Sequence, residues 1–379
     1  MPERKENWQD MSYAFWSAFD LKRVLLGLMG MLASVLWVCA ILWFFSGVGL
    51  IKTGPTVLLA ALLQPPLAGA CGIYSHFCAA ATSGSWKVYL SLSLIIFGLL
   101  AIWSVMGGAI TRIASLDYAK GDKVGMKDSL GYCLKKFWSY FWAPVAPIVA
   151  ATFFVLLNAI GGLVGQVKFL EVLVALGFPI ILLFSFLILF VAITGAVGSL
   201  LMIPTISADG SDAFDAMSRA YSYVLSKPIN YVIYLVAAAG YGALCMIIAA
   251  TVIDLLVQTS FITVGMGMGK KFDAMAGAVG GLSQPAGLAA SYGFMTQVKM
   301  AFGPLSTKTM VFTASALLFY IVVVKLVLWS IAAAFLGSAQ TVLYLLMRKD
   351  VDGTEVTDVY VEEVEEEIKP PEPVAETAP

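Results

Sequence analysis

The chain has 379 residues, of which 60% are apolar and 12% are charged, and its mean hydropathy is +0.88. These values lie outside the range of soluble globular proteins and exclude an ordinary water-soluble domain. The apolar residues fall in runs longer than the roughly 18 residues that a span across a bilayer requires. The sequence therefore predicts an all-α fold, a polytopic membrane helix bundle.

The formal net charge of −1 averages two unlike parts. Residues 1–349 hold 22 Lys and Arg against 13 Asp and Glu, whereas residues 350–379 hold one Lys against 11 acidic residues. Segment 347–379 is too acidic to bury an apolar core, and we expect a disordered cytoplasmic tail. Such a tail either docks a basic protein partner or is a solvated end.

The first 20 residues are polar and aromatic, without a signal-peptide pattern, so the first span is expected to remain in the protein. Residues 1–23 predict a helix at the membrane interface, with Met11, Phe15 and Ala18 on one face. A transmembrane domain is expected over 24–346. Its six predicted spans lie at about 24–45, 88–110, 140–164, 172–203, 229–256 and 311–346.

Two connecting segments carry apolar or Gly-rich stretches that do not read as spans. Residues 46–86 contain an apolar run broken by Pro65 and Pro66, which is too short to cross and favours a re-entrant or interfacial piece. Residues 259–310 are rich in glycine, and we expect an outside loop with interfacial helices or a re-entrant piece. A nucleotide-binding interpretation of these glycines fails, because no strand precedes them.

Segments 126–141 and 213–225 have apolar residues at helical spacing with polar residues opposite, which predicts two more interfacial helices. Each precedes an odd-numbered span, as the N-terminal helix does. The chain is therefore interpreted as three units of interfacial helix plus hairpin. The alternative is that any loop beside lipid tends to be amphipathic.

Basic residues are distributed unevenly between the two sets of loops, 15 on one side and 7 on the other, with Lys325 inside the last span. Because basic residues concentrate in cytoplasmic loops, this bias favours both termini inside. The basic residues expected at the membrane surface are Arg112, Lys127, Lys135, Lys136 and Arg219. They flank spans, and so they do not indicate nucleic-acid binding.

The stretch from Arg112–Ala119 into Ser129–Trp142, and the stretch from Gly210–Asp215 to Arg219–Tyr223, resemble the cytoplasmic elbows of uncharacterised bacterial six-span inner-membrane proteins. These are similar to the membrane domain attached to some glycerophosphodiester phosphodiesterases. The resemblance covers about residues 107–235 and implies the fold only; the location that we expect is the bacterial inner membrane. Phosphodiesterase chemistry is not implied, because that chemistry looks to need paired histidines and this chain has one.

Asp254 and Lys325 are the ionisable residues most clearly placed within apolar runs. A charge at membrane depth is costly, and it is by default a candidate functional site. One interpretation is a polar pair that marks a transport path together with Asn158. The other is a structural pair, or an Asp254 that already lies near the outer surface.

Cys71 and Cys78 flank His76 in the first outside segment. In an oxidising compartment the two cysteines could form a disulfide, and three soft ligands without a fourth are a weak metal signature. Unpaired thiols are the remaining interpretation. With a single histidine, no Ser–His–Asp arrangement can be assembled, and we expect no catalytic, cofactor or metal site.

Taken together, the sequence predicts a noncatalytic membrane scaffold or accessory subunit in contact with the lipid bilayer. A cytoplasmic protein partner is expected to bind through the acidic tail. The alternative is a small-solute or lipid transporter that uses Asp254 and Lys325.

Overall fold

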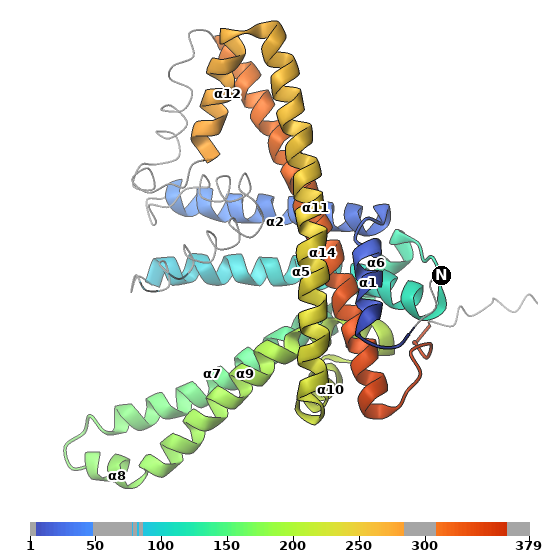
Figure 1. Cartoon of the computed structure of the whole chain (residues 1–379). Coiled ribbons are helices and arrows are strands. Elements are labelled where there is room, and N and C mark those ends of the chain that lie inside the picture. The colour runs from blue at the N-terminus through green and yellow to red at the C-terminus, as the bar shows by residue number, and fades with distance from the viewer. Residues whose placement is uncertain (1–4, 48–77, 79–81, 83–85, 284–307, 362–379) are drawn as a thin grey trace, which may run out of the picture.

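A computed structural model describes residues 5–47, 78, 82, 86–283 and 308–361 (Figure 1). This part of the chain contains eleven α-helices, one 3-10 turn and no strand. Six of the helices are long and apolar enough to cross a membrane. The predicted all-α fold with six spans is confirmed, and the chain is an integral, multi-pass membrane protein.

The helices fall into long spans and short connecting elements. In chain order they are η1 (Trp8–Asp10), α1 (Met11–Ser17), α2 (Leu21–Gly47), α5 (Trp86–Lys120), α6 (Met126–Lys135), α7 (Phe137–Val164), α8 (Glu171–Leu176), α9 (Phe178–Asp209), α10 (Ala213–Ser226), α11 (Pro228–Met268), α12 (Lys270–Ser283) and α14 (Lys308–Asp352).

The six long helices pair as three hairpins, α2 with α5, α7 with α9, and α11 with α14. The hairpins meet at one end of the molecule and diverge toward their tips (Figure 1). Only 6–22% of the most apolar window of each span is buried within the protein. Because apolar side chains are stable in contact with lipid tails, the exposed arms are the surface that the bilayer covers.

The main hydrophobic core lies at the end where the hairpins meet, between the last turns of α5, α9 and α14 and the short helices α1, α6 and α10. Ile110, Met202 and Leu345 are among its fully buried members. At Gly337 a Cβ atom would lie 2.6 Å from Cγ2 of Ile110, closer than real contacts allow. A glycine at this position therefore lets α14 pack directly against α5.

The two interfacial helices α6 and α10 turn small or polar residues toward the protein and large apolar ones outward. Helix α10 buries Ala213, Ala216 and Ala220, while Phe214 is 72% exposed. In α6, Cys133 is buried and Leu134 is 62% exposed. Small side chains let these helices lie close to the bundle, and the outward apolar residues suit a helix in the membrane interface.

A five-residue pattern, aromatic–x–Leu–x–basic, occurs where each hairpin begins. It spans Phe19–Arg23, Tyr132–Lys136 and Tyr223–Lys227. The central leucine is exposed in all three copies, by 69% at Leu21, 62% at Leu134 and 54% at Leu225. The structure thus has the arrangement expected of three units, each built from an interfacial helix and a hairpin.

The basic residue of each copy binds the end of the second helix of its own hairpin. Arg23 Nη2 lies 2.5 Å from Asp117 Oδ2 in α5. Lys136 donates to the Gly210 carbonyl oxygen after α9, and Lys227 donates to that of Asp350 in α14. Each contact closes the open end of a hairpin, so the three hairpins are held at their bases by equivalent positions.

Helix α14 and the residues after it differ from the expectation of a disordered tail over 347–379. The helix continues to Asp352, and Gly353, with φ +70°, ends it. Residues 353–361, which we call the C-terminal strap, turn back onto the core, with Val356 1% and Val359 4% exposed. This part of the prediction is wrong, because the apolar strap residues are buried and basic side chains hold its backbone.

The bounds of two spans also differ from those predicted from the sequence. Helix α9 begins at Phe178, after the short α8, and α11 continues to Met268 before turning into α12. Residues 260–268, expected in an outside loop, are therefore part of a long helix. The expected re-entrant piece at 57–70 lies outside the described residues.

Candidate functional site: the polar junction

A group of buried polar side chains lies where the last turns of α5, α9 and α14 meet. We call it the polar junction; its members are Thr111, Arg112, Ser115, Tyr132, Tyr140, Ser207, Asp209, Tyr344 and Arg348. Buried polar groups are costly unless hydrogen-bonded. Here they are bonded to one another and to main-chain carbonyls of neighbouring helices.

Arg112 is only 4% exposed. Its Nη1 donates to the carbonyl oxygens of Ser207, at 2.6 Å, and Tyr360, at 2.9 Å, and its guanidinium lies 4.2 Å from the centroid of the Tyr132 ring. Both hydrogen bonds reach neutral carbonyl oxygens, and the guanidinium lies over the electron-rich face of the Tyr132 ring. Arg112 therefore ties α5 to α9 and to the strap.

Ser207 connects the helices around it through its hydroxyl. Its Oγ lies 2.6 Å from Thr111 Oγ1 in α5 and 2.8 Å from the Tyr140 hydroxyl in α7. Tyr132 of α6 donates to the Ile206 carbonyl oxygen one residue earlier, at 3.0 Å. The end of α9 is thus the centre of a network that includes four helices.

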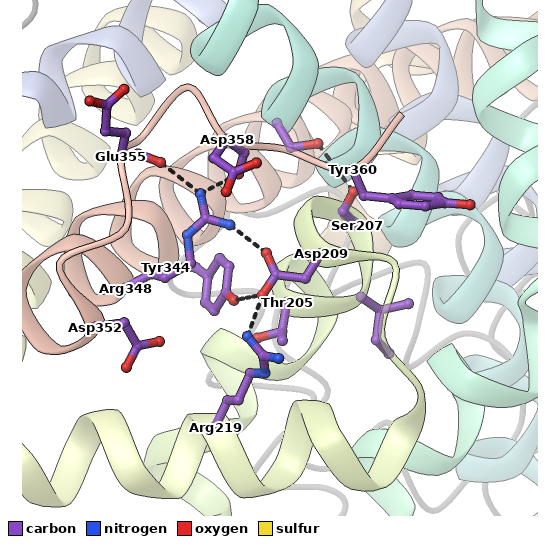
Figure 2. A network of polar contacts seen from close by, with 12 residues as sticks. Thr205, Ser207, Asp209, Arg219, Tyr344, Arg348, Asp352, Glu355, Asp358 and Tyr360 are labelled. Atoms are coloured by element: carbon purple, nitrogen blue, oxygen red, sulfur yellow. Dashed lines mark hydrogen bonds and ion pairs between the residues drawn. The ribbon is translucent and has the colours of Figure 1, made fainter. Parts of the chain in front are cut away.

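Asp209, the last residue of α9, binds three side chains (Figure 2). Its Oδ1 accepts from Arg348 Nη1 at 2.5 Å, and its Oδ2 accepts from Arg219 Nη1 at 3.0 Å and from the Tyr344 hydroxyl. Arg219 also donates from Nε to both oxygens of Asp215, at 3.0 Å each. One carboxylate, with 10% of its side chain exposed, therefore joins α9, α10 and α14.

The strap is held through its main chain. Arg348 Nη2 donates to the carbonyl oxygens of Glu355, at 3.1 Å, and Asp358, at 2.6 Å. The Tyr360 amide donates to the Ala208 carbonyl oxygen at 2.8 Å. Figure 2 shows the strap passing over Arg348 toward Ser207, with Tyr360 at its far end.

The ionisable groups on the short helices keep one charge state over a wide pH range. Hydrogen bonds to Asp215 raise the pKa of Arg219 further above its ordinary value. Burial, followed by the hydrogen bond to Asp352, raises the pKa of Tyr223. Burial raises the pKa of the Cys133 thiol to about 12. These groups therefore hold structure at neutral pH without titrating.

Asp254 and Lys325 are brought together by the structure. Lys325 Nζ lies 2.5 Å from Asp254 Oδ1, between α11 and α14, with 10% of the Lys325 side chain and 45% of the Asp254 side chain exposed. Asn158 lies elsewhere, since its Nδ2 donates to Ser185 Oγ at 3.2 Å between α7 and α9. The three residues named for a transport path belong to two different hairpins.

The five basic residues expected at the membrane surface differ in how far they are buried. Arg112 is buried in the polar junction, which corrects the expectation, because its hydrogen bonds to carbonyls replace those to water. Arg219 and Lys136 contact the junction, and Lys136 Nζ lies 5.7 Å from the Tyr360 ring centroid. Lys127 and Lys135 are exposed on α6.

Sequence reasoning missed Asp209, Tyr344 and Arg348. They lie at span ends, where charged and aromatic residues are ordinarily assigned to the interface. The repeated aromatic–x–Leu–x–basic pattern was the signal that could have pointed to this end of the hairpins. Cys71 and His76 lie outside the described residues. Cys78 is described and is an exposed free cysteine, so the structure does not contain the expected Cys71–Cys78 disulfide.

The site belongs to an all-α, six-span membrane protein and consists of fixed charges and main-chain acceptors. Within the described ranges, no group of three His, Cys, Asp or Glu side chains could hold a metal ion. Comparison of the chain with family models, with curated proteins and with solved structures found no match to any of them.

Proposed function

We propose that this protein is a noncatalytic membrane scaffold or accessory subunit that presents an acidic C-terminal tail from a fixed point. The observation that carries this proposal is the strap, held by Arg112 and Arg348 at the centre of the polar junction. Because the strap is fixed to the core, the acidic tail that follows it begins at a defined position on the molecule.

The strap is bound through its main chain, which leaves several of its side chains exposed to a partner. Arg112 and Arg348 take main-chain oxygens, while Glu355 and Asp358 have exposed side chains and Tyr360 is 46% exposed. The following residues, 362–379, contain seven Glu and one Lys. Charge complementarity therefore favours a basic protein partner at this end of the molecule.

The location follows from the distribution of basic residues. The positive-inside rule favours the cytoplasmic side for the junction end and for both termini, and we propose a bacterial inner membrane as the location. The partner would then be a cytoplasmic protein or the cytoplasmic part of another membrane protein.

The test is affinity purification from membranes of the full chain and of a chain that ends at Val361. This cut removes the tail and keeps the strap, whereas a cut at Lys349 would also leave Arg348 and Arg112 without their strap acceptors. We expect a partner that copurifies with the full chain and is lost from the shortened one. A full-length control with all seven Glu of 362–379 replaced by Gln should lose the same partner.

Retention of the partner by both altered chains would show that docking does not use the tail charge. Loss with the shortened chain but not with the Gln control would assign binding to the tail sequence and not to its charge. If the full chain itself retains nothing, the scaffold proposal loses its main support.

The transporter alternative is favoured by the Asp254–Lys325 pair alone. The pair lies one helical turn from an apolar cavity of about 340 Å³ between α11, α12 and α14, which Val257 and Ile321 help to line. Proton and sodium flux into proteoliposomes tests it. Flux that Asp254→Asn and Lys325→Met both abolish would favour the transporter; equal flux with and without these changes would remove it.

A further inference from the structure

A second polar cavity, of about 290 Å³, lies at the base of the α2/α5 hairpin, apart from the polar junction. It is lined by Asp20, Lys22, Ile113, Asp117, Lys123 and Val124. Asp20 directly precedes α2, Lys22 lies in its first turn, and the other lining residues come from the last turns of α5 and the loop after it. Four charged side chains therefore line one cavity, and they are partly exposed at its opening, with 38% of the Asp20 side chain and 20% of the Asp117 side chain accessible.

The cavity lies at the depth of lipid headgroups. Lys22 belongs to the first turn of one span and Asp117 to the last turn of the next, and headgroups lie beside the ends of spans. Next to it, Trp16 is 73% exposed, Phe19 44% and Leu21 69%. Exposed Trp and large apolar residues at a span end are typical of the membrane interface.

A buried arginine fixes the two carboxylates. Arg23 is fully buried; its Nη2 lies 2.5 Å from Asp117 Oδ2, and Tyr13 donates to the same carboxylate. Its Nη1 donates to Ser338 Oγ at 3.2 Å. Its Nε has no hydrogen-bond partner and faces Asp20 Oδ2 at 3.6 Å. The arginine therefore draws both carboxylates toward the protein.

Lys22 and Lys123 have N–H donors that are available to a ligand. Lys22 Nζ donates to the Val124 carbonyl oxygen at 3.1 Å, and an ammonium has two further donors. Lys123 is exposed and makes no hydrogen bond or ion pair to any residue in the described part of the chain. With Arg23 included, the three cations exceed the two carboxylates by one charge.

We propose that this cavity binds the phosphate of a phospholipid headgroup, with Lys22 and Lys123 donating to its oxygens. One phosphodiester carries a single negative charge and balances the excess positive charge. Ammonium groups are common ligands of phosphate oxygens. The exposed Trp16, Phe19 and Leu21 contact the acyl region of the same leaflet, so the ligand is a bilayer lipid and not a soluble phosphate.

The test uses the purified full chain, delipidated in detergent and titrated with dioleoylphosphatidylglycerol in mixed micelles, with bound lipid counted by native mass spectrometry. Lys123→Gln is the test variant, because Lys123 is exposed and its loss leaves the fold intact. Lys120→Gln is the matched control, because Lys120 is also exposed, three residues away, and does not line the cavity.

We expect Lys123→Gln to weaken phosphatidylglycerol binding about tenfold, the loss expected for one hydrogen bond to a charged group. Lys120→Gln should bind as the unaltered chain does, and Lys22→Gln should resemble Lys123→Gln. Dioleoylglycerol, which lacks the phosphate, should bind no better to the unaltered chain than to Lys123→Gln.

Three results would overturn the proposal. Equal affinity of Lys123→Gln and Lys120→Gln would show that the cavity does not hold the phosphate. Equal binding of dioleoylglycerol and phosphatidylglycerol would show that the headgroup is not recognised. Inorganic phosphate that competes as well as the lipid itself would make the ligand a soluble phosphate.

Discussion

Arg348 near the end of α14 and Asp209 at the end of α9 lie 2.5 Å apart, from Nη1 to Oδ1, with about 5% and 10% of their side chains exposed. The pair is 139 residues apart in sequence and joins two different hairpins. Because Asp209 holds Nη1, the other terminal nitrogen is directed at the strap. The same arginine thus closes the bundle and positions the tail.

Replacing Arg348 by Met should destabilise the protein by about 1.5–3 kcal/mol, because Asp209 loses one of its two arginine partners and keeps Arg219. It should also release the strap, since the carbonyl oxygens of Glu355 and Asp358 lose their donor. Thermal unfolding in detergent measures the first effect. Limited proteolysis measures the second, as new cleavage within residues 353–361.

Lys127→Gln is the control for this change, because Lys127 is exposed on α6 and should alter neither property. Unchanged cleavage of the strap in Arg348→Met would show that the buried valines hold it without the arginine. Asp209→Asn should destabilise the protein as well, since it removes the charge that Arg348 and Arg219 share.

Replacing Gly337 by Ala should destabilise the bundle by about 1–3 kcal/mol, as overpacking a core does. The added Cβ would lie 2.6 Å from Cγ2 of Ile110, so α14 and α5 must move apart. Gly240→Ala is the matched control, because a Cβ there meets nothing within 4 Å in α11. That change should be neutral or stabilising by about 0.5–1 kcal/mol, from the helix propensity of Ala. Equal melting temperatures of the two variants would contradict the close approach.

Stability should fall as the pH rises above about 10. Burial raises the pKa of Tyr13 and of Tyr223 above the ordinary value of 10.0, and each is bonded to a carboxylate. The folded state therefore favours the neutral phenol, and this stability is present below pH 10 and lost as the unfolded phenols ionise. Melting temperatures from pH 7 to 11 measure the effect.

In that series, Tyr13→Phe and Tyr223→Phe should each reduce the fall in melting temperature between pH 10 and 11. Both changes should also lower the melting temperature at pH 7. A pH dependence as steep as that of the unaltered chain would show that other groups cause the alkaline loss.

Cys133 should resist alkylation. Its thiol is fully buried in α6 and burial raises its pKa to about 12, so almost no thiolate is present at pH 8. Cys78 is exposed and should react within the time in which Cys133 does not. Mass spectrometry of peptides after maleimide treatment, in mild detergent and after denaturation, measures both. Comparable reaction at the two cysteines in mild detergent would mean that the α5–α6 contact opens readily.

The six spans, the pairing of spans into hairpins and the amphipathic helices before them could be predicted from the sequence. Each depends on residues close together in the chain: an apolar run either is or is not long enough to cross, and a turn joins neighbours. Phe214 shows the limit, because an apolar residue on an interfacial helix can face either the protein or the lipid. Here alanines fill the protein side and Phe214 faces out.

The polar junction could not be predicted in the same way, because its contacts join residues that are far apart in the sequence. The composition and the apolar runs determined that the chain enters a membrane, and the order of the residues determined that the last thirty or so are acidic. Only the tertiary structure decided that Arg112 and Arg348 are buried, because their acceptors belong to helices and a strap distant in sequence. A charge at a span end is stable in water or among buried hydrogen-bond and ion-pair partners, and only the packing of three hairpins supplies the second environment.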